Sequence, residues 1–289
     1  MKTGFVAIIG EPNVGKSTLL NRLLKTKLSI TSNKPQTTRY RILGILTKGD
    51  CQCLFLDTPG IIEPAYLLQE YMVKEIKEAL EGADVVLWVI DPWFKVENFP
   101  PKFLKMIGDK PVILVINKID LVSNKNDILP LIERMKEYAV KEIVPISALS
   151  GEGVEELENI IFRELPEGPF LYPPEELSDR PVRFFVAELI REKIFELYRK
   201  EIPYSTGVII EEFKEREKGK DYIRATIYVE KDSQKAILIG RDGAGLKKIG
   251  EMARKEIEEL VGKGVYLDLW VKVREGWRKD KRFLRELGY

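Results

Sequence analysis

The chain contains no histidine and only two cysteines in 289 residues. Without an imidazole it lacks the commonest general base, the serine and cysteine triads, and every zinc site with a histidine ligand. Cys51 and Cys53 are too few for a closed zinc site, and on a strand both would point to one face. We interpret them as small strand residues of a protein in a reducing compartment. Catalysis therefore has to rest on backbone groups, carboxylates, lysine, hydroxyls or a metal ion.

Long hydrophobic runs are also missing. Residues 83–90 and 112–116 hold the longest apolar stretches, which have the length of strands and fall far short of the ~20 residues of a membrane-spanning helix. Residues 1–9 carry one lysine and no small-residue cleavage pattern, unlike a secretory signal peptide. We therefore expect a soluble protein.

Composition and length predict two globular domains. Apolar residues make up 44% of the chain and charged residues 32%, a balance that excludes a disordered chain. A domain takes roughly 100 to 200 residues, so two domains fit this length. Residues 166–181 contain five of the 16 prolines, and that density interrupts helices and central strands. We predict an N-terminal domain at 1–166, a proline-rich linker at 167–181 and a C-terminal domain at 182–289.

The first domain alternates apolar strand patterns with amphipathic helices. Continuous apolar strands between such helices are typical of an α/β fold with a doubly wound, mostly parallel sheet covered on both faces. The expected strands span residues 5–9, 41–47, 51–56, 85–90, 112–116 and 143–146. The expected helices begin at residue 15 and span residues 72–80, 103–108, 128–138 and 154–165.

A phosphate-binding loop lies between the first strand and the first helix. Its glycines let backbone N–H groups and the helix N-terminus face a polyphosphate. We predict that Lys16 contacts the β and γ phosphates and that the Ser17 hydroxyl ligates Mg²⁺. The loop meets the pattern GxxxxGK[ST] with a following threonine, and we expect all of it to bind the nucleotide: Gly10, Glu11, Pro12, Asn13, Val14, Gly15, Lys16, Ser17 and Thr18.

A second motif, DxxG, ends the strand at 51–56. It comprises Asp57, Thr58, Pro59 and Gly60, which reach the carboxyl edge of the sheet, where ligands of open α/β sheets bind. We predict that Asp57 supports the Mg²⁺ ion through water and that the Gly60 N–H donates to the γ phosphate.

A third motif, NKxD, directly follows the strand at 112–116 and selects the base. Guanine presents its N1–H and 2-amino donors side by side, and one carboxylate, that of Asp120, can accept both. Adenine would leave this carboxylate unpaired, so a plain ATPase is disfavoured. We expect Asn117 to brace the loop and the stem of Lys118 to lie along the base.

A fourth motif follows the strand at 143–146. It comprises Ser147, Ala148 and Leu149, and we predict that the Ala148 N–H donates to the guanine O6.

These four motifs, in this order, resemble those of the translation-factor-like GTPases over residues 1 to about 165. The resemblance implies a first switch at residues 28–39 and a second at 57–70. In the first switch Thr37 or Thr38 would ligate Mg²⁺, and we prefer Thr38. The residues expected to act in catalysis are Lys16, Thr38, Gly60 and Asn13.

One position departs from the best-known GTPases. The glutamine that many of them carry after the DxxG glycine is Ile61 here, and isoleucine cannot orient water. We therefore expect slow intrinsic hydrolysis. In relatives that resemble this chain, the residue at Asn13 helps to hold a monovalent cation such as K⁺, which would supply charge at the phosphates. The sequence leaves open whether K⁺ activates GTP hydrolysis.

The order of the expected elements predicts a smaller α+β fold for the second domain. We expect a helix at 182–200, strands at 207–216 and 221–230, a short helix at 234–237, a helix ending at 261 and a strand at 266–273. A GxxG loop before a basic helix resembles that of a type II KH domain, in which two glycines let the backbone approach about four nucleotides of single-stranded RNA. The resemblance implies RNA contacts from Ile239, Gly240, Arg241, Asp242, Gly243, Leu246, Lys247 and Lys248.

The C-terminal end is basic. Residues 231–289 hold 15 Lys and Arg against 10 Asp and Glu, net +5, although the whole chain is only +1. Residues 277–285 are net +4 and expected to be helical. They can form a solvated helix face, or their cations can contact RNA phosphates while their aromatic rings stack or pack. The expected phosphate contacts are Arg278, Lys279, Lys281 and Arg282.

The whole chain resembles the Era family of GTPases, through GEPNVGKST, QTTR, DTPG, NKID, SAL and IGRDG in this order. The resemblance implies a monomeric cytoplasmic GTP-binding factor for 30S small ribosomal subunit assembly, sometimes found at the inner membrane surface. It also implies that the KH module binds near the 3′ end of 16S rRNA and that nucleotide state controls this binding. Composition and spacing alone do not identify ribosomal RNA as the target.

Two other classes of function compete with this one. The chain could be a GTP-regulated peripheral membrane scaffold whose basic tail binds anionic lipid. However, Trp277, Phe283 and Leu284 are few apolar residues for a membrane-binding face. It could also be an RNA-modification enzyme, but such relatives use a cysteine, and both cysteines here fall inside the expected GTPase sheet.

Overall fold

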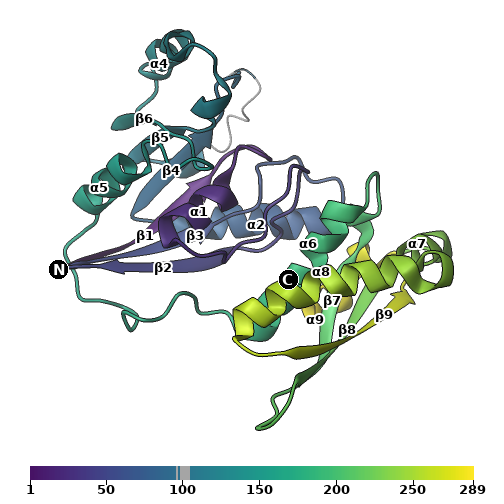
Figure 1. The fold of residues 1–289 in the computed structure, drawn as a ribbon. Coiled ribbons are helices and arrows are strands. Elements are labelled where there is room, and N and C mark those ends of the chain that lie inside the picture. Colours follow the sequence, from purple (N-terminus) through teal and green to yellow (C-terminus); the bar gives the residue numbers. More distant parts are fainter. Residues whose placement is uncertain (96, 98–104) are drawn as a thin grey trace. The chain divides into compact units, whose positions relative to one another are not determined.

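The computed structural model describes residues 1–95, 97 and 105–289, and these residues form two compact units (Figure 1). Unit 1 comprises Met1–Glu63 and Met72–Asp179. Unit 2 comprises Arg180–Tyr289 together with the short segment Pro64–Tyr71. The sequence did not predict that this segment belongs to the second unit.

Unit 1 is built on a six-stranded sheet in the order β2-β3-β1-β4-β5-β6. All neighbouring strands are parallel except β2, which runs antiparallel to β3. The sheet therefore has the predicted doubly wound, mostly parallel form. Its strands are β1 (Lys2–Ile9), β2 (Ile42–Lys48), β3 (Cys51–Asp57), β4 (Val85–Ile90), β5 (Val112–Ile116) and β6 (Glu142–Pro145).

Helices cover both faces of this sheet. Along β1, Ala7 and Ile9 join the core cluster that contains Ile76 of helix α2. The alternate residues Val6 and Ile8 are also fully buried, so they face helices on the other side. The helices of unit 1 are α1 (Lys16–Leu24), α2 (Leu67–Gly82, which begins in unit 2), α4 (Leu129–Met135) and α5 (Val154–Glu164), with the 3₁₀ turns η2 (Ile119–Leu121) and η3 (Lys125–Ile128).

Several expected helices differ from the structure in their bounds. The helix expected at 72–80 is longer, because α2 spans Leu67–Gly82, and the helix expected at 182–200 ends at Leu197. The helix expected at 128–138 is shorter, because α4 begins at Leu129 after a 3₁₀ turn and ends at Met135, beyond which the N–H groups of Glu137 and Tyr138 donate to carbonyl oxygens only three residues back. Of the helix expected at 103–108, residues 103 and 104 lie outside the described residues, and residues 105–107 are helical.

The proline-rich stretch is bound to unit 1 rather than free. The Gln52 side chain donates to the carbonyl oxygen of Tyr172 at 2.8 Å and accepts the N–H of Leu171 at 2.8 Å. Farther along, the Ile45 N–H donates to the carbonyl oxygen of Leu177 at 2.9 Å. Most of the expected linker therefore lies along strands β2 and β3 and belongs to unit 1.

Unit 2 has a three-stranded sheet in the order β7-β8-β9, with β7 and β8 antiparallel and β8 and β9 parallel. The apolar residues of alternate positions on its strands form a core with α6 and α8, as expected for helices on one side of the sheet. The elements of unit 2 are α6 (Val182–Leu197), η4 (Pro203–Ser205), β7 (Gly207–Lys214), β8 (Asp221–Val229), α7 (Asp232–Ile239), η5 (Arg241–Gly243), α8 (Ala244–Val261), β9 (Val265–Val273), η6 (Trp277–Lys279) and α9 (Lys281–Glu286).

A second apolar cluster in unit 2 contains the C-terminal tail. Trp277, Phe283 and Leu284 are almost fully buried and pack with Leu68 of the segment Pro64–Tyr71. The Trp277 indole N–H donates to the carbonyl oxygen of Ser205 at 2.9 Å. The aromatic residues of the tail therefore pack into unit 2, which is one of the two possibilities raised by the sequence.

None of the helices in the described part of the chain has the length and apolar character needed to cross a membrane.

Candidate functional site

The phosphate-binding loop joins β1 to α1 in a backbone conformation that requires glycine twice. Gly10 has a φ of +153° and Gly15 a φ of +97°. A Cβ on Gly15 would lie 2.2 Å from Nδ2 of Asn117, and one on Gly10 would lie 2.1 Å from the carbonyl oxygen of Val89. Gly15 is the N-cap of α1, so the N–H groups of the first helical turn adjoin the loop, as an anion site requires.

Lys16 is the buried cation of this loop, with 6% of its surface exposed. Its ammonium group donates to the carbonyl oxygens of Gly10 (3.0 Å) and Glu11 (2.9 Å). Burial lowers the pKa of Lys16 to about 8, and the Asp57 and Glu11 carboxylates oppose this shift. A cation buried in this way is stabilised most by an anionic ligand.

Three side-chain oxygens meet beside this lysine. The Ser17 hydroxyl donates to Asp57 Oδ2 at 2.7 Å and lies 2.8 Å from Thr38 Oγ1. Asp57 is fully buried, burial raises its pKa, and its other oxygen, Oδ1, has no hydrogen-bond partner among the described residues. Two hydroxyls and a carboxylate with a spare buried oxygen fit Mg²⁺, which prefers hard oxygen ligands.

The two adjacent threonines of the first switch have different partners. Thr38 contacts Ser17, whereas the Thr37 hydroxyl donates to the carbonyl oxygen of Lys34 at 2.8 Å. The geometry therefore favours Thr38 as the metal-facing threonine.

The DxxG loop is anchored to the strand and to the phosphate-binding loop. The Thr58 hydroxyl donates to the carbonyl oxygen of Ile8 at 2.7 Å, and Pro59 is buried. A Cβ on Gly60 would lie 2.7 Å from Cα of Pro12, so only glycine allows the two loops to approach this closely.

Ile61 packs into the core of unit 1. Its N–H donates to the carbonyl oxygen of Gly10 at 3.0 Å, and its side chain is 5% exposed within the core cluster. This side chain is therefore turned away from solvent and has no polar group with which to hold a water molecule.

Asn117 connects the phosphate-binding loop to the loop after β6. Its Nδ2 donates to the carbonyl oxygen of Val14, and its Oδ1 accepts the N–H of Ala148, both at 2.8 Å. Asn117 is 2% exposed, so these bonds are shielded from water. This bracing is the role that the sequence predicted for Asn117.

The N–H of Ala148, expected to donate to the guanine O6, has a partner in the protein. It donates to Asn117 Oδ1 at 2.8 Å, and Ala148 is 1% exposed. Ser147 is buried and its hydroxyl accepts the N–H of Ser150 at 3.1 Å, while Leu149 is 72% exposed. The SAL loop therefore acts first as a support for the neighbouring loops.

The remaining NKxD residues lie at the surface of the same edge. Asp120 is exposed in the 3₁₀ turn η2, where its carboxylate is accessible to a ligand. Lys118 has a positive φ of 66°, and its Nζ lies 4.0 Å from Asp91 Oδ2.

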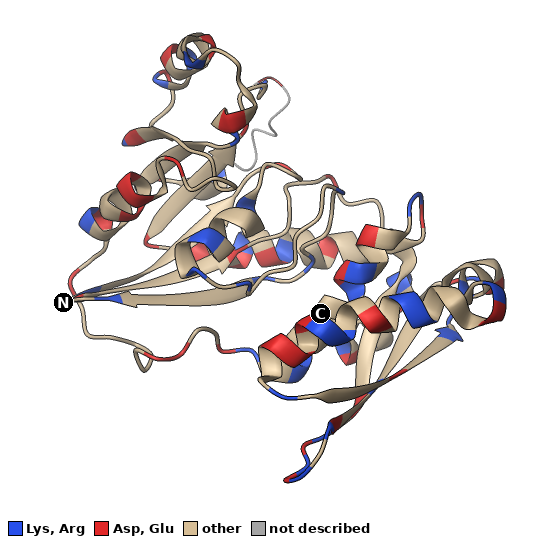
Figure 2. Cartoon of the chain, viewed as in Figure 1, with Lys and Arg blue, Asp and Glu red and all other residues tan. Residues whose placement is uncertain are grey.

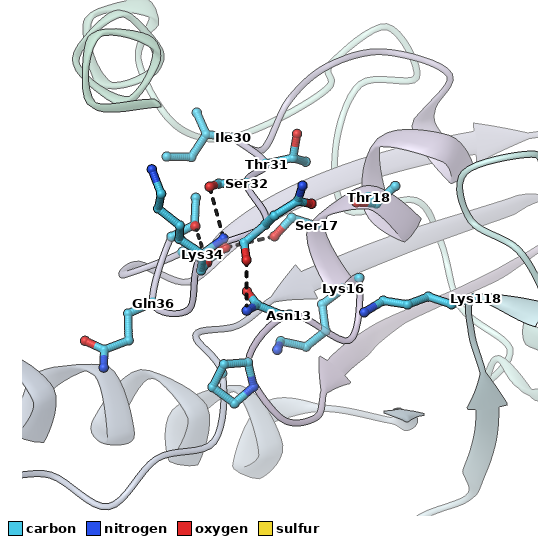
Figure 3. Close-up of a pocket in the computed structure, with 16 residues that line it drawn as sticks. Asn13, Lys16, Ser17, Thr18, Ile30, Thr31, Ser32, Lys34, Gln36 and Lys118 are labelled. Atoms are coloured by element: carbon cyan, nitrogen blue, oxygen red, sulfur yellow. Dashed lines mark hydrogen bonds between the residues drawn. The ribbon is translucent and has the colours of Figure 1, made fainter. Parts of the chain in front are cut away.

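A cavity of about 450 Å³ unites the phosphate-binding loop, the first switch, Gly60 and Lys118 (Figure 3). The figure shows Asn13, Lys16 and Ser17 on one side of it and the first-switch residues on another. The Asn13 side chain donates to the carbonyl oxygen of Asn33 at 3.2 Å and so links the two sides. The sequence did not single out several lining residues of the first switch, namely Ile30, Thr31, Ser32, Asn33, Lys34 and Gln36.

Two supporting residues on α1 were also missed. Asn21 Oδ1 accepts the N–H groups of Leu28 (2.9 Å) and Ser29 (2.8 Å), which fixes the start of the first switch. Arg22 Nε donates to the carbonyl oxygen of Ala148 at 3.0 Å and holds the SAL loop. Both residues lie outside the motifs, and their partners are distant or irregular segments that no local pattern reveals.

Unit 2 contains the GxxG loop between α7 and α8. Gly240 and Gly243 have φ values of +71° and +77°, and Asp242 between them has +50°. A Cβ on Gly240 would lie 2.8 Å from the backbone nitrogen of Gly245, so the turn into α8 requires glycine here. Ile239, the last residue of α7, packs against the core of unit 2.

A groove of about 570 Å³ runs beside this loop between α8 and the edge strand β9. Of the loop and helix residues expected to contact RNA, Gly243, Leu246 and Lys247 line it. Those that do not line it are Ile239, Gly240, Arg241, Asp242 and Lys248. Basic and acidic residues alternate along α8 (Figure 2). The lining residues that the sequence did not single out are Lys220, Gly250, Glu251, Arg254, Val265, Tyr266, Leu267 and Leu269.

The four cations expected in the tail have different surroundings. Arg278 forms an ion pair with Glu230, and its guanidinium carbon lies 4.8 Å from the centroid of the Tyr66 ring. Lys279, Lys281 and Arg282 are exposed. Of the four expected cations, these three are therefore accessible to a phosphate, and Arg282 Nε lies 4.0 Å from Glu286 Oε1.

Comparisons with known proteins agree with both units. A family model described as a 50S ribosome-binding GTPase matches residues 5–118, and a KH domain model matches residues 201–278. GTPase Era of Geotalea uraniireducens is 49% identical over 294 residues, which cover 100% of this chain and 98% of that protein. Two solved structures each have a TM-score of 0.94 and 45% identity, covering 100% of this chain and 99% of theirs. One is a variant of Aquifex aeolicus Era bound to GDP·AlF4⁻, and the other is Era in complex with MgGDPNP and nucleotides 1506–1542 of 16S ribosomal RNA.

Proposed function

The chain belongs to the GTPase Era family, and from this membership we propose that it binds GTP with Mg²⁺, hydrolyses it to GDP and phosphate, and assists small-subunit assembly through 16S rRNA. The observation that carries the nucleotide site is the contact of the Ser17, Thr38 and Asp57 oxygens beside the buried Lys16. This arrangement places one buried cation and three metal-facing oxygens at one edge of a cavity.

Hydrolysis rests on few groups of this chain. Bound Mg²⁺ would neutralise developing charge on the phosphates, held by Ser17, Thr38 and Asp57. Lys16 stabilises charge on the β and γ phosphates, and the Gly60 N–H orients the γ phosphate. Because the buried Ile61 side chain cannot position water, slow turnover without an activator follows.

Asn13 is the residue that bears on K⁺. Its side-chain Nδ2 donates to the carbonyl oxygen of Asn33 at 3.2 Å, so the amide group, which also carries Oδ1, is held beside a carbonyl oxygen of the first switch. Such oxygens suit a monovalent cation, and we propose that K⁺ raises turnover. Equal turnover in K⁺ and Na⁺ buffers would contradict this.

The RNA part of the proposal rests on unit 2. The similar Era structure is in complex with nucleotides 1506–1542 of 16S ribosomal RNA, and the groove beside the GxxG loop here has Lys220, Lys247 and Arg254 in its lining. We propose that this groove binds single-stranded RNA at the 3′ end of 16S rRNA and that it does so in assembly of the 30S subunit.

Nucleotide control of RNA binding is supported by the chain path. The expected second switch, residues 57–70, begins at the metal-facing Asp57 and ends within the segment Pro64–Tyr71 of unit 2. A change at the γ phosphate is therefore connected by only a few residues to the apolar cluster around Leu68. Equal RNA affinity with GDP and with a non-hydrolysable GTP analogue would overturn this coupling.

The apolar residues of the C-terminal segment do not support the membrane-scaffold alternative. Trp277, Phe283 and Leu284 are buried, so the tail presents cations but not the apolar face that membrane insertion needs. We propose that the protein acts in the cytoplasm. Flotation of the purified chain with anionic liposomes in physiological salt would contradict this placement.

The experiment that tests base selection changes Asp120 to Asn. An amide can donate to the 2-oxo group of xanthine, which replaces the 2-amino group of guanine, so Asp120→Asn should prefer XTP over GTP. Asp127→Asn, an exposed carboxylate on η3, serves as the matched control and should keep the GTP preference. If the wild-type chain binds ATP as tightly as GTP, the proposed function is wrong.

A further inference from the structure

The face of the unit 2 sheet opposite α6 and α8 carries a group of exposed aromatic rings beside the part that Phe283 of α9 covers through Tyr228 and Ile209. Leu267, Leu269 and Val271 of β9 pack toward the core, so the alternate residues Tyr266, Asp268 and Trp270 lie on the opposite face. Tyr266 is 60% exposed and Trp270 55% exposed. We call Tyr222, Tyr266 and Trp270, with Asp268 between them, the outer aromatic cluster.

Hydrogen bonds hold the outer aromatic cluster in a fixed arrangement. Asp268 Oδ2 accepts the hydroxyl of Tyr222 at 3.0 Å and the indole N–H of Trp270 at 3.1 Å. The rings of Tyr222 and Tyr266 are stacked, with centroids 5.9 Å apart and an interplanar angle of 13°. The polar ends of Tyr222 and Trp270 are thus satisfied within the protein. Tyr266 has one ring face stacked on Tyr222, and Tyr266 and Trp270 remain 60% and 55% exposed. Preordered, exposed rings are the usual form of a stacking surface.

The position of the cluster indicates what would cover it. Tyr266 also lines the groove beside the GxxG loop, together with the cations Lys220, Lys247 and Arg254. The groove and the cluster therefore meet at β9, the edge strand of the sheet. Since a KH groove holds about four nucleotides, a longer single strand that crosses this edge would reach the cluster next.

Spacing and charge on this face suit a nucleic acid strand. Tyr266 and Trp270 are four residues apart on one strand, about 13 Å at ~3.3 Å per residue, so two different bases can each occupy a ring. Arg224 and Lys272 lie on the same face at alternate positions of β8 and β9 and are exposed. Lys272 is accessible to a phosphate, whereas Arg224 lies 3.5 Å from Glu212 Oε2 and would have to exchange that ion pair for a phosphate. The Asp268 carboxylate is already engaged by two donors, which reduces its repulsion of phosphates.

We propose that the outer aromatic cluster is a second RNA subsite, where bases adjacent to those in the groove stack on Tyr266 and Trp270. This inference rests on the proposed binding of single-stranded RNA by unit 2. Tyr266 and Trp270 provide the additional affinity for RNA that is longer than the groove can hold. Asp268 positions the rings.

The test measures the affinity of the full chain for two single-stranded RNAs from the 3′ end of 16S rRNA, one of four nucleotides and one of ten. Trp270→Ala should weaken binding of the ten-nucleotide RNA by roughly 5- to 150-fold, the range for losing one stacked base, and change four-nucleotide binding less than twofold. Trp270→Phe keeps a ring face and should restore most of the loss. Trp93→Ala removes a ring of similar exposure, 58%, from unit 1 and should leave both affinities unchanged.

The outcomes separate this inference from the function on which it rests. Equal affinity of wild type and Trp270→Ala for the longer RNA would overturn the second subsite, and so would an equal loss for both lengths. Failure of the wild-type chain to bind RNA of either length would overturn RNA binding itself. Asp268→Asn should give a smaller, length-dependent loss, because an amide cannot accept both donors as strongly as a carboxylate.

Discussion

Replacement of Asn117 by alanine is the most direct test of how the nucleotide site is held together. Asn117 is 2% exposed and makes two hydrogen bonds of 2.8 Å, to the carbonyl oxygen of Val14 and from the N–H of Ala148. Alanine would leave both backbone groups buried and unpaired. At about 1–3 kcal/mol for each unsatisfied group, the free energy of unfolding should fall by ~2–6 kcal/mol.

The assay is urea unfolding of the nucleotide-free chain, with GTP affinity measured in parallel by fluorescence titration. Asn117→Asp keeps an acceptor for the Ala148 N–H but turns an acceptor toward the Val14 carbonyl oxygen, so its loss of stability should persist. Asn159→Ala, at an exposed position of α5, should change the free energy of unfolding by no more than about 0.5 kcal/mol.

A loss for Asn117→Ala no larger than that for Asn159→Ala would refute the bracing role. So would a large loss of GTP affinity with unchanged stability, because Asn117 would then act on the ligand and not on the loops.

Three further predictions concern other parts of the chain. Burial lowers the pKa of Lys16 to about 8, below its value in the unfolded chain, so the folded state holds fewer protons between about pH 8 and 10.5, and nucleotide-free stability should rise across that window. Lys16→Met should abolish this rise in pH-dependent urea melts, and a fall in its place would show the sign to be wrong. Thr38→Ala should raise the Mg²⁺ concentration needed for half-maximal hydrolysis at least tenfold, whereas Thr37→Ala should shift it little, and the reverse order would exchange their roles. Trp277→Ala should lower the free energy of unfolding of unit 2, measured by calorimetry, by about 3–5 kcal/mol, because a fully buried indole and its hydrogen bond are lost. A loss below about 1 kcal/mol would contradict this packing.

The sequence predicted best what is encoded in continuous residues. The strands at 85–90 and 112–116 have the observed bounds, because a run of apolar residues buried on both faces has a sharp start and end. The phosphate-binding loop was equally clear, since its backbone turn depends on glycines that a local pattern detects.

Long-range contacts account for most of what the sequence could not predict. Gln52 binds the segment around Tyr172, 120 residues away, and no local pattern pairs them. The segment Pro64–Tyr71 belongs to unit 2 through Leu68. In the sequence, Leu68 cannot be distinguished from the other apolar residues of an amphipathic helix. Likewise, only the structure shows that the Ala148 N–H donates to Asn117, which lies 31 residues earlier in the chain.

The membership of Pro64–Tyr71 in unit 2 determines how this protein can be dissected. A fragment cut at the apparent linker would carry the whole KH module but leave Leu68 behind, baring the apolar surfaces of Trp277, Phe283 and Leu284. Exposed aromatic surface of that kind favours self-association. Truncated forms that aggregate would therefore report a missing piece of their fold and give no information about the RNA affinity of the intact chain.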